Sequence, residues 1–388
     1  MAADKILFFL CIFCVFIGII ASFSLSAYAI LRYDISYSYY FFLRQCIAGF
    51  LGIFVMWAIS QLNPDKYLTL IGFILFTVCL LSMGFMHYLP EQFVTSAGGA
   101  KRWIRLFGFS FAPVEFFKIG FVFFLAWSFD RKINSEKKSL KAEVILLLPY
   151  AGLFAVFVYL IAVMQNDIGQ VIVLALTLAV MVLFAGTSFK LFSIVILLSS
   201  VVATFAIVNS ENRIMRIKVW WSTAQNVVLS FLPEGLAKNL RVENVPEPYQ
   251  LSHSLNAINH GGFFGEGIGS GIVKLGYLSD VHTDFVLAGL TEELGVLGVL
   301  CITLIFCVII CRIFIIASRC GNRVHSLFAL GVAMLIVFSF LMNAYGITSI
   351  TPIKGIAVPF LSYGGSSLLA TCVGVGMVLM ISKKVDLK

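Results

Sequence analysis

The residues that offer chemistry most directly are the carboxylates of the stretch LSDVHTDFVLAGLTEELG, which begins at Leu278. Asp284 comes just before a long apolar run, and Glu292 and Glu293 lie inside that run. An ionisable group at the edge of a membrane segment is costly, so it usually faces protein or water and often marks a functional site. The alternative interpretation is structural: Asp284 caps the following helix, and the two glutamates pair with basic residues inside the bundle.

Basic residues form a second set, because they gather in the two segments 89–112 and 209–282. They are Lys101, Arg102, Arg105, Arg213, Arg216, Lys218, Lys238, Arg241 and Lys274. A positive surface of this kind suits an anionic partner, either lipid headgroups or the phosphate of a substrate. Taken one at a time, these side chains can be explained as ordinary contacts with headgroups. Their clustering in two segments favours a binding site.

Three interruptions of otherwise apolar sequence accompany these charges. They are QND at 165–167, the glycine-rich stretch 261–271, and NAYGITSITPIKGIAVPFLSYGGSS at 343–367. Irregular backbone at membrane depth is tolerated only where it lines a cavity or is buried in protein. The glycine-rich stretch lacks the G-K-[ST] ending of a nucleotide-binding P-loop, so we exclude an ATPase. A set of tight turns is the alternative interpretation of these glycines.

The elements that must position these residues are membrane helices. Hydrophobic residues make up 60% of the chain and charged residues 12%, and the mean hydropathy is +1.01. A span needs about 20 apolar residues, and the apolar runs are too long for barrel strands. We predict an all-α, polytopic membrane protein with one domain over 1–388 and about ten spans. They are expected at 6–29, 41–60, 68–88, 113–129, 143–164, 168–186, 188–208, 284–318, 327–346 and 361–382.

The orientation of the spans follows from the basic loop after the fourth of them. This loop contains Arg131, Lys132, Lys137, Lys138 and Lys141. Loops rich in Lys and Arg stay in the cytoplasm. With ten spans, both termini are then cytoplasmic, and the segments 89–112 and 209–282 are extracytoplasmic. The second of these is the large loop between spans seven and eight. All three polar interruptions are therefore expected at the outer face.

Five segments, taken together and in order, resemble the SEDS family (shape, elongation, division and sporulation) over almost the whole chain. They are GAKRWIRLFGFSFAPVEFFKI at 99–119, QNDIG at 165–169, YQLSHSLNAINHGGFFGEGIGSGIVKLGYL at 249–278, HTDFVLAGLTEELG at 282–295 and PIKGIAVPFLSYGGSS at 352–367. The N-terminal SAYAI and YFFLRQ are more similar to the cell-division branch (FtsW) than to the elongation branch (RodA). Against the family pattern, Asn166 replaces a proline, Val114 replaces a serine, and the segment before HTDF differs at Ser279.

The resemblance implies a peptidoglycan glycosyltransferase of the bacterial cytoplasmic (inner) membrane. Such an enzyme polymerises lipid II into β-1,4 glycan strands at the outer face and releases undecaprenyl pyrophosphate. The cell-division branch implies septal wall synthesis, with an elongation role as the alternative. The implied partners are a class B penicillin-binding protein, which is a transpeptidase, and other membrane proteins of the division machinery. We expect no nucleotide or organic cofactor and no nucleic-acid partner.

The family's essential aspartate corresponds to Asp284, which we assign as the general base that activates the sugar hydroxyl in an inverting transfer. Cationic side chains or a divalent cation, Mg²⁺ or Mn²⁺, are expected to stabilise the leaving pyrophosphate. Candidate substrate contacts are Lys101, Arg102, Arg213, Arg216, Lys274, His282, Thr283, Ser366 and Ser367. Supporting roles are expected for Glu115, Lys118, Gln165, Asp167, Glu292 and Lys354. Among these, Glu115 is expected to pair with Lys118 or a nearby arginine, and no residue is assigned as a metal ligand.

Two other classes of function fit parts of the pattern. A transporter could flip lipid II, since broken helices and charges inside the membrane suit both transporters and enzymes. A transporter needs polar groups through the full depth of the membrane, however, and here they gather at the expected outer face. A scaffold that recruits a transpeptidase without chemistry would keep its function when Asp284 is replaced by asparagine. The enzyme is the interpretation that we carry to the structure.

Overall fold

The computed structural model describes residues 3–32, 39–97, 99–106, 109–133, 140–208, 210–243, 245–246 and 249–386 of the 388-residue chain. The α-helices are α1 (Lys5–Leu25), α2 (Ala27–Arg32), α3 (Tyr40–Gln61), α4 (Pro64–Phe85), α5 (Pro113–Lys132), α6 (Leu140–Val158), α7 (Ile168–Phe184), α8 (Phe189–Val208), α9 (Glu211–Leu229), α10 (Glu234–Leu240), α11 (Tyr249–Gly261), α12 (Val286–Arg319), α13 (Arg323–Ile347) and α14 (Gly365–Ser382). Short 3₁₀-helices are η1 (Met86–Tyr88), η2 (Glu91–Phe93) and η4 (Val273–Leu275), and η3 (Tyr159–Met164) is a π-helix. Lys137 and Lys138 of the basic loop lie outside the described residues.

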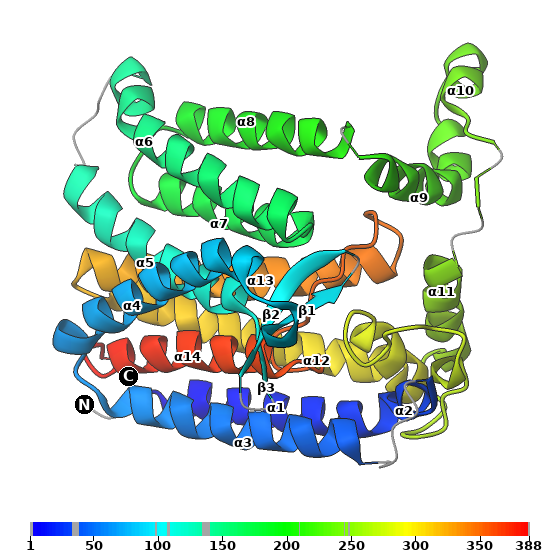
Figure 1. Ribbon diagram of the computed structural model, residues 1–388, viewed down its shortest axis with the longest axis horizontal. Helices are drawn as coiled ribbons and strands as arrows, with labels where there is room; N and C mark the ends of the chain where they lie inside the picture. Colours follow the sequence, from blue (N-terminus) through cyan, green and yellow to red (C-terminus); the bar gives the residue numbers. More distant parts are fainter. Residues whose placement is uncertain are drawn as a thin grey trace.

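The predicted membrane fold is confirmed, because each of the ten predicted spans is mainly helical. Seven described helices are long and apolar enough to cross a membrane, and α7 and part of α8 are shorter apolar helices. Both termini lie at the same end of the bundle (Figure 1). The backbone N–H of Asp4 donates to the Ser382 hydroxyl at 3.0 Å, which joins the two ends directly.

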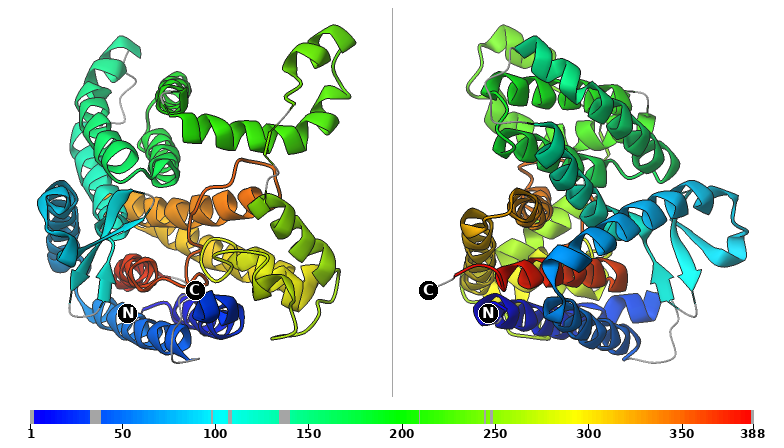
Figure 2. Two further views of the ribbon diagram at one scale, coloured as in Figure 1. Left: turned by 45° about the vertical axis from the view of Figure 1, so that its right-hand side comes forward. Right: turned by 90° about the vertical axis from the view of Figure 1, so that its left-hand side faces the viewer.

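The helices stack in layers on either side of α13. Figure 2 shows α1 and α3 on one side, with α6 and α8 on the opposite side. Glycines allow the closest approaches: a Cβ atom on Gly120 of α5 would lie 2.3 Å from the backbone nitrogen of Phe76 in α4. Small residues at such crossings are the usual means of packing membrane helices. The result is a dense core of α5, α13 and α14, while α6 and α8 leave many apolar side chains exposed.

Several of these helices begin with a polar N-cap residue whose side chain accepts hydrogen bonds from the first backbone N–H groups. The Asp4 carboxylate accepts hydrogen bonds from the N–H groups of Ile6 and Leu7 at the start of α1. Asn63 and Asn322 cap α4 and α13 in the same way. Each cap satisfies N–H groups that have no partner inside the helix. The apolar runs therefore start as helices where the sequence provides a side-chain acceptor.

A small β-sheet is an addition to the all-α prediction. Strands β1 (Val94–Ala97), β2 (Ala100–Leu106) and β3 (Phe109–Phe111) form an antiparallel sheet in the order β1-β2-β3. The segment is too polar to continue α4, and its alternating pattern KRWIRL suits a strand. The sheet carries Arg102 on its central strand and leads directly into α5.

The eighth predicted span is not one continuous helix, which corrects the sequence expectation. Gly295 has φ 72° and ψ 177°, so the backbone of α12 breaks there. The segment 262–267 pairs with residues 292–297 across this break through four backbone hydrogen bonds of 2.9–3.2 Å. Glycine is the residue that accepts this conformation without strain. The first part of α12, from Val286 to the break, is thereby joined to the glycine-rich stretch.

Candidate active site

Asp284 lies on a tight turn immediately before α12. The N–H groups of Thr283, Asp284 and Phe285 all point to the carbonyl oxygen of Asp280, at 3.0, 3.1 and 3.4 Å. The Thr283 hydroxyl donates to the same oxygen at 3.0 Å. Asp280 itself has φ 55°, a conformation that few non-glycine residues adopt. This turn leaves the Asp284 side chain mostly buried, with part of its surface exposed.

The irregular segment 348–364 holds Asp284 from the other side. Asn343, near the end of α13, donates its amide hydrogens to the backbone oxygens of Asp284 and Ile356 at 2.7 and 2.8 Å. A Cβ atom on Gly355 would lie 2.5 Å from the Asp284 Oδ2 atom. The Ser362 hydroxyl donates to the carbonyl of Thr283 at 2.6 Å. The position of the carboxylate is therefore determined by two segments about 70 residues apart in the sequence.

His282 packs inside the turn, and its predicted contact with a substrate stays a prediction. Its side chain is 6% exposed, and its ring lies 4.9 Å from that of Phe41 and 5.5 Å from that of Tyr363. Burial lowers the pKa of His282 to about 4, although the nearby Asp280 acts in the opposite direction. The imidazole is therefore uncharged at neutral pH and packs as an aromatic ring.

Arg102 connects the sheet to the QND triplet. Its Nε and Nη2 atoms donate to the carbonyls of Gln165 and Asn166, both at 2.8 Å. Arg213 of α9 donates to the carbonyl of Ala162 at 2.7 Å and to the Asn166 side chain at 2.8 Å. These carbonyls lie at the end of η3 or just after it, where a helix leaves its last acceptors without partners, and Asn166 then turns the chain with φ 52°. Gln165 is buried and contributes its backbone to this site.

Asp167 caps α7 and lies in the same charged neighbourhood. Its carboxylate accepts from the N–H of Gln170 at 3.3 Å. Burial raises the pKa of Asp167, and the charge of Arg102 acts against this effect. Burial lowers the pKa of Lys354, as do the positive charges of Arg216 and Arg213, while Asp167 raises it. The structure thus brings together predicted residues from the sheet, α7, α9 and the segment 348–364.

The electrostatic surroundings of Asp284 suit a base that works near neutral pH. Burial raises the pKa of Asp284 to about 7, and the negative charges of Asp280 and Asp167 add to this effect. Arg102 and Arg216 act in the opposite direction. A carboxylate with a pKa close to the working pH both accepts and releases protons efficiently. The geometry and the charge of this position point to acid–base chemistry.

Glu115 and Lys118 form the predicted ion pair, with 2.9 Å between Nζ and Oε2. Gln170 joins both partners, accepting from Lys118 at 2.8 Å and donating to Glu115 at 2.9 Å. The three side chains line a cavity together with Ser367 and Thr371. Gln170 also donates its backbone N–H to the Asp167 carboxylate, so one hydrogen bond links the polar side of this cavity to the charged site.

The two predicted serines have different positions. The Ser366 hydroxyl donates to the carbonyl of Ser110 at 2.7 Å and accepts from the N–H of Ala112 at 3.0 Å. It is 9% exposed and joins the start of α14 to β3, so it is a structural contact. Ser367 is partly exposed on the wall of the cavity.

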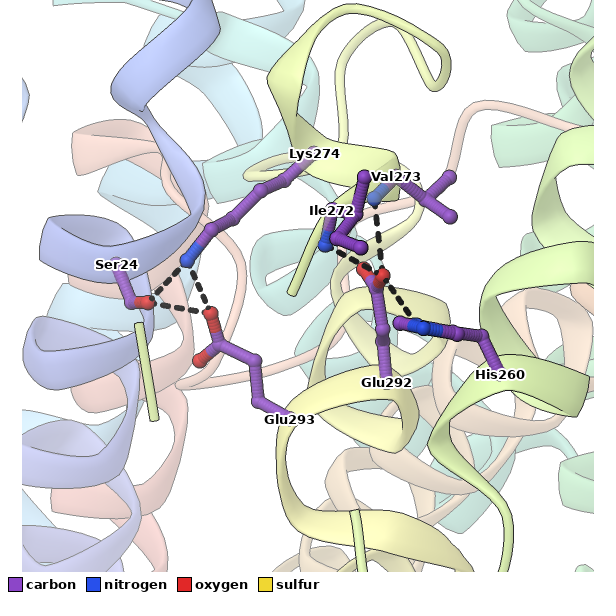
Figure 3. A network of polar contacts seen from close by, with 7 residues as sticks. All are labelled: Ser24, His260, Ile272, Val273, Lys274, Glu292 and Glu293. Carbon is purple, nitrogen blue, oxygen red and sulfur yellow. Dashed lines mark hydrogen bonds and ion pairs between the residues drawn. The ribbon is translucent and has the colours of Figure 1, made fainter. Parts of the chain in front are cut away.

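Two lysines that we predicted as substrate contacts are occupied elsewhere. The Lys101 ammonium donates to the carbonyls of His87 and Leu89 at 2.9 and 2.8 Å, which holds β2 against η1 and the residue after it. The Lys274 ammonium is buried and pairs with Glu293 at 2.6 Å (Figure 3). Glu292 and Glu293 both have partners inside the protein, as the structural interpretation of the sequence expected. Both ammonium groups therefore have protein acceptors in this structure, and their contact with a substrate stays a prediction.

Sequence reasoning missed several residues of this site. They are Asp280, Gln170, Asn343, Gly355 and Tyr363. Asp280 stood four residues before Asp284, and this proximity was the available signal. Asn343 and Gly355 gave no signal, because their importance comes from an approach between distant segments. A lone asparagine or glycine in an apolar region has many structural explanations.

The fold and the site define a class: a polytopic helical membrane protein that holds a carboxylate of raised pKa and fixed arginines at the end of its bundle away from the termini. The chain belongs to the FtsW/RodA/SpoVE family, since the family model described as "Cell cycle protein" matches residues 4–387. This confirms the resemblance that the sequence motifs indicated.

Relatives and solved structures agree with this assignment. A Helicobacter pylori (strain ATCC 700392 / 26695) protein named probable peptidoglycan glycosyltransferase FtsW is 47% identical over 385 residues, 99% of each chain. The protein of the same name from Bacillus subtilis (strain 168) is 31% identical, covering 91% of this chain and 84% of that protein. The rod shape determining protein RodA of Thermus thermophilus has the same fold, with a TM-score of 0.64 and 22% identity over 100% of this chain and 99% of its own. So does a chain of a peptidoglycan synthase complex, with a TM-score of 0.69 and 22% identity over 99% and 98%.

Proposed function

We propose that this protein is a peptidoglycan glycosyltransferase that polymerises lipid II into β-1,4 glycan strands for the septal wall during cell division. The observation that carries the proposal is the Asp284 carboxylate, whose pKa is raised to about 7 beside Arg102 and Arg216. Relatives named FtsW that match the full length of the chain support the division role. The scaffold interpretation gives no reason for a carboxylate tuned in this way.

In the proposed reaction, the oxygen of the sugar 4-hydroxyl attacks the anomeric carbon of the second sugar. The Asp284 carboxylate accepts the proton of that hydroxyl during the attack. The bond from that carbon to the pyrophosphate oxygen breaks, and undecaprenyl pyrophosphate leaves with the bonding electron pair. A single displacement inverts the anomeric centre, so an α-linked donor gives a β-linked product. Positioned proton transfer of this kind contributes about 10²–10⁴-fold to the rate.

The leaving pyrophosphate gathers negative charge. We assign the stabilisation of this charge to Arg102 and Arg216, with Arg213 and Lys354 beside them. Arg102 is held by two backbone carbonyls, so it needs no rearrangement when charge develops. A divalent cation, Mg²⁺ or Mn²⁺, is a further expectation for this chemistry. Among the described residues, no three acidic, histidine or cysteine side chains are grouped as metal ligands.

The partner and location belong to the same proposal. A class B penicillin-binding protein would use the new glycan strands for crosslinking, and a similar chain occurs in a peptidoglycan synthase complex. The seven apolar helices found among the described residues fit a multi-pass membrane protein. We place it in the bacterial cytoplasmic (inner) membrane at the division septum, with the Asp284 site at the outer face.

Purified protein, with its cognate transpeptidase, tests the proposal when it is supplied with lipid II. Glycan chains on a gel are the expected result. The lipid II flippase is the competing outcome: translocation of lipid II in vesicles, without any polymer from the same preparation, would replace the enzyme by a transporter. Polymer formation in cells that lengthen but do not divide would support the elongation role instead.

The pH dependence of kcat follows from the site. Asp284 must be ionised to accept a proton, so kcat is expected to rise with pH through about 7. Below that value it should fall about tenfold per pH unit. The Asp280→Asn variant removes one neighbouring negative charge, so its rise should occur at lower pH. Initial rates of polymerisation from pH 5 to 9 measure both effects, and an identical profile for the two proteins would count against Asp284 as the titrating base.

A further inference from the structure

The two ends of the loop that carries Asp284 lie next to each other. Residues 272–293, which we call the Asp284 loop, leave the glycine-rich stretch, form η4, turn at Asp280 and return as the first part of α12. Figure 3 shows the point where the two ends of this loop meet. Two adjacent glutamates of α12, Glu292 and Glu293, make the contacts there.

Glu292 fastens the backbone of the first end. Its Oε1 atom accepts hydrogen bonds from the N–H groups of Ile272 and Val273 at 2.7 and 2.9 Å, and contacts the His260 Nδ1 atom at 3.1 Å. The glutamate is 0% exposed. A Cβ atom on Gly271 would lie 2.8 Å from the Oε2 atom, so the chain passes directly against this carboxylate.

Glu293 fastens the neighbouring side chain. Its Oε1 atom accepts from the Lys274 ammonium at 2.6 Å and from the Ser24 hydroxyl of α1 at 2.5 Å. Lys274 also donates to Ser24 at 3.1 Å. The exposed fractions of Lys274 and Glu293 are 3% and 2%. The contact therefore ties both ends of the Asp284 loop to α1.

Stability alone is a weak explanation for this arrangement. Removing two charges from water costs several kcal/mol per ion, and apolar residues of similar size often give equal or greater stability at such places. Two adjacent buried carboxylates double that cost. These contacts fix the orientation of the groups that they join, because each carboxylate oxygen binds particular donors. Apolar residues cannot do this. Between the two fastened ends the chain forms η4 and a series of turns, and Asp284 lies on the last of these, the Asp280 turn.

We propose that Glu292 and Glu293 are positioning residues that fix the Asp284 loop and thereby hold the Asp284 carboxylate in its reactive place. This inference rests on the proposed function for its kinetic consequences. Glu292 sets the backbone at 272–273, Glu293 sets Lys274, and the intervening backbone transmits both constraints to the Asp280 turn. A displacement of about 1 Å in such a group can cost about 100-fold in rate.

The test is the double variant Lys274→Met/Glu293→Met, which removes the fastening and leaves neither charge buried without a partner. Its kcat for lipid II polymerisation should fall about 10–100-fold while KM stays within about twofold. The acid limb of its kcat profile should move to lower pH, because a looser loop admits water to the carboxylate. Glu292→Gln keeps an acceptor oxygen for both N–H groups and should retain most activity, whereas Glu292→Met should resemble the double variant.

The matched control removes a second ion pair of α12, far along the helix from Asp284. Arg312 donates to the Asp4 carboxylate at 2.7 Å. The variant Arg312→Met/Asp4→Asn should alter the melting temperature without changing KM, the pH profile or hydrogen exchange at 275–285. Faster amide exchange in that segment is expected only for the double variant at 274 and 293 and for Glu292→Met.

Two results would overturn the inference. The first is an unchanged pH profile and unchanged exchange at 275–285 in the double variant. The second is loss of activity in proportion to the folded fraction alone, equal to that of the control. If the wild-type protein makes no polymer, the proposed function fails, and hydrogen exchange still decides whether the two glutamates fix the loop.

Discussion

Replacing Asp284 by asparagine is expected to reduce the rate of lipid II polymerisation about 10²–10⁴-fold, because the amide cannot accept the hydroxyl proton. The side chain keeps its shape, and the backbone contacts from Asn343 and the Asp280 turn do not involve the carboxylate. KM for lipid II should therefore change little. Initial rates at saturating lipid II, with products separated on a gel, measure the loss.

The same variant should be more stable than the wild type. Burial raises the pKa of Asp284 from 3.8 to about 7, so the folded protein favours the protonated acid. The free energy of unfolding therefore falls as the pH rises from about 4 to about 7. At neutral pH this loss amounts to about 1–4 kcal/mol for a partly exposed group. Asparagine removes this cost. The melting temperature of the variant is therefore expected to exceed that of the wild type by more at pH 7.5 than at pH 4. Equal polymer from both proteins would refute Asp284 as the base.

Replacing Gly295 by alanine is expected to cause the largest loss of structure. Gly295 has φ 72°, and a Cβ atom there would lie 2.4 Å from the Phe263 carbonyl oxygen and 2.5 Å from the Gly265 nitrogen. Backbone atoms cannot move aside as a flexible side chain can. Strain and the loss of the pairing with 262–267 together should cost about 2–4 kcal/mol.

Activity of the Gly295→Ala protein should fall with its folded fraction, and the glycine-rich stretch should become sensitive to protease. Gly84→Ala in α4 is the matched control, because nothing lies within 4 Å of the added methyl group and alanine favours a helix. It should be at least as stable as wild type. A Gly295→Ala protein with normal stability would show that the break in α12 does not depend on glycine.

The helices were largely predictable from the sequence, since runs of about 20 apolar residues have few alternatives in a membrane. The break at Gly295 was not, because a glycine among apolar residues fits an unbroken helix equally well. The sheet at 94–111 was missed for a related reason: its strands are short, and their pairing depends on contacts with α14 and η1. Local pattern predicts elements, whereas approach between distant segments decides where they are interrupted.

For the site, the residue types were predicted better than their partners. The position of Asp284 at the edge of an apolar run was sufficient to select it, and Arg102, Arg216 and Asp167 act on the same carboxylate in the structure. Lys101 and Lys274 could not be separated from the arginines by sequence alone. In the structure, Lys101 donates to two backbone carbonyls and Lys274 to one carboxylate, all within 2.9 Å. A lysine far from its acceptor in the sequence gives no indication of that pairing.

The π-helix η3 has a consequence for changes in chain length. Its wide winding lets the N–H of Gln165 bond to the carbonyl of Leu160 and that of Asp167 bond to the carbonyl of Ile161. Removing one residue between 159 and 164 would turn this wide turn into ordinary α-helical winding, and both long backbone hydrogen bonds would lose their geometry. The QND triplet would keep roughly its direction, because a π-turn holds about one residue more than an α-turn. One residue inserted earlier, in α6, would instead rotate everything after it by roughly 100°, so the site is more sensitive to a change of length in α6 than in η3.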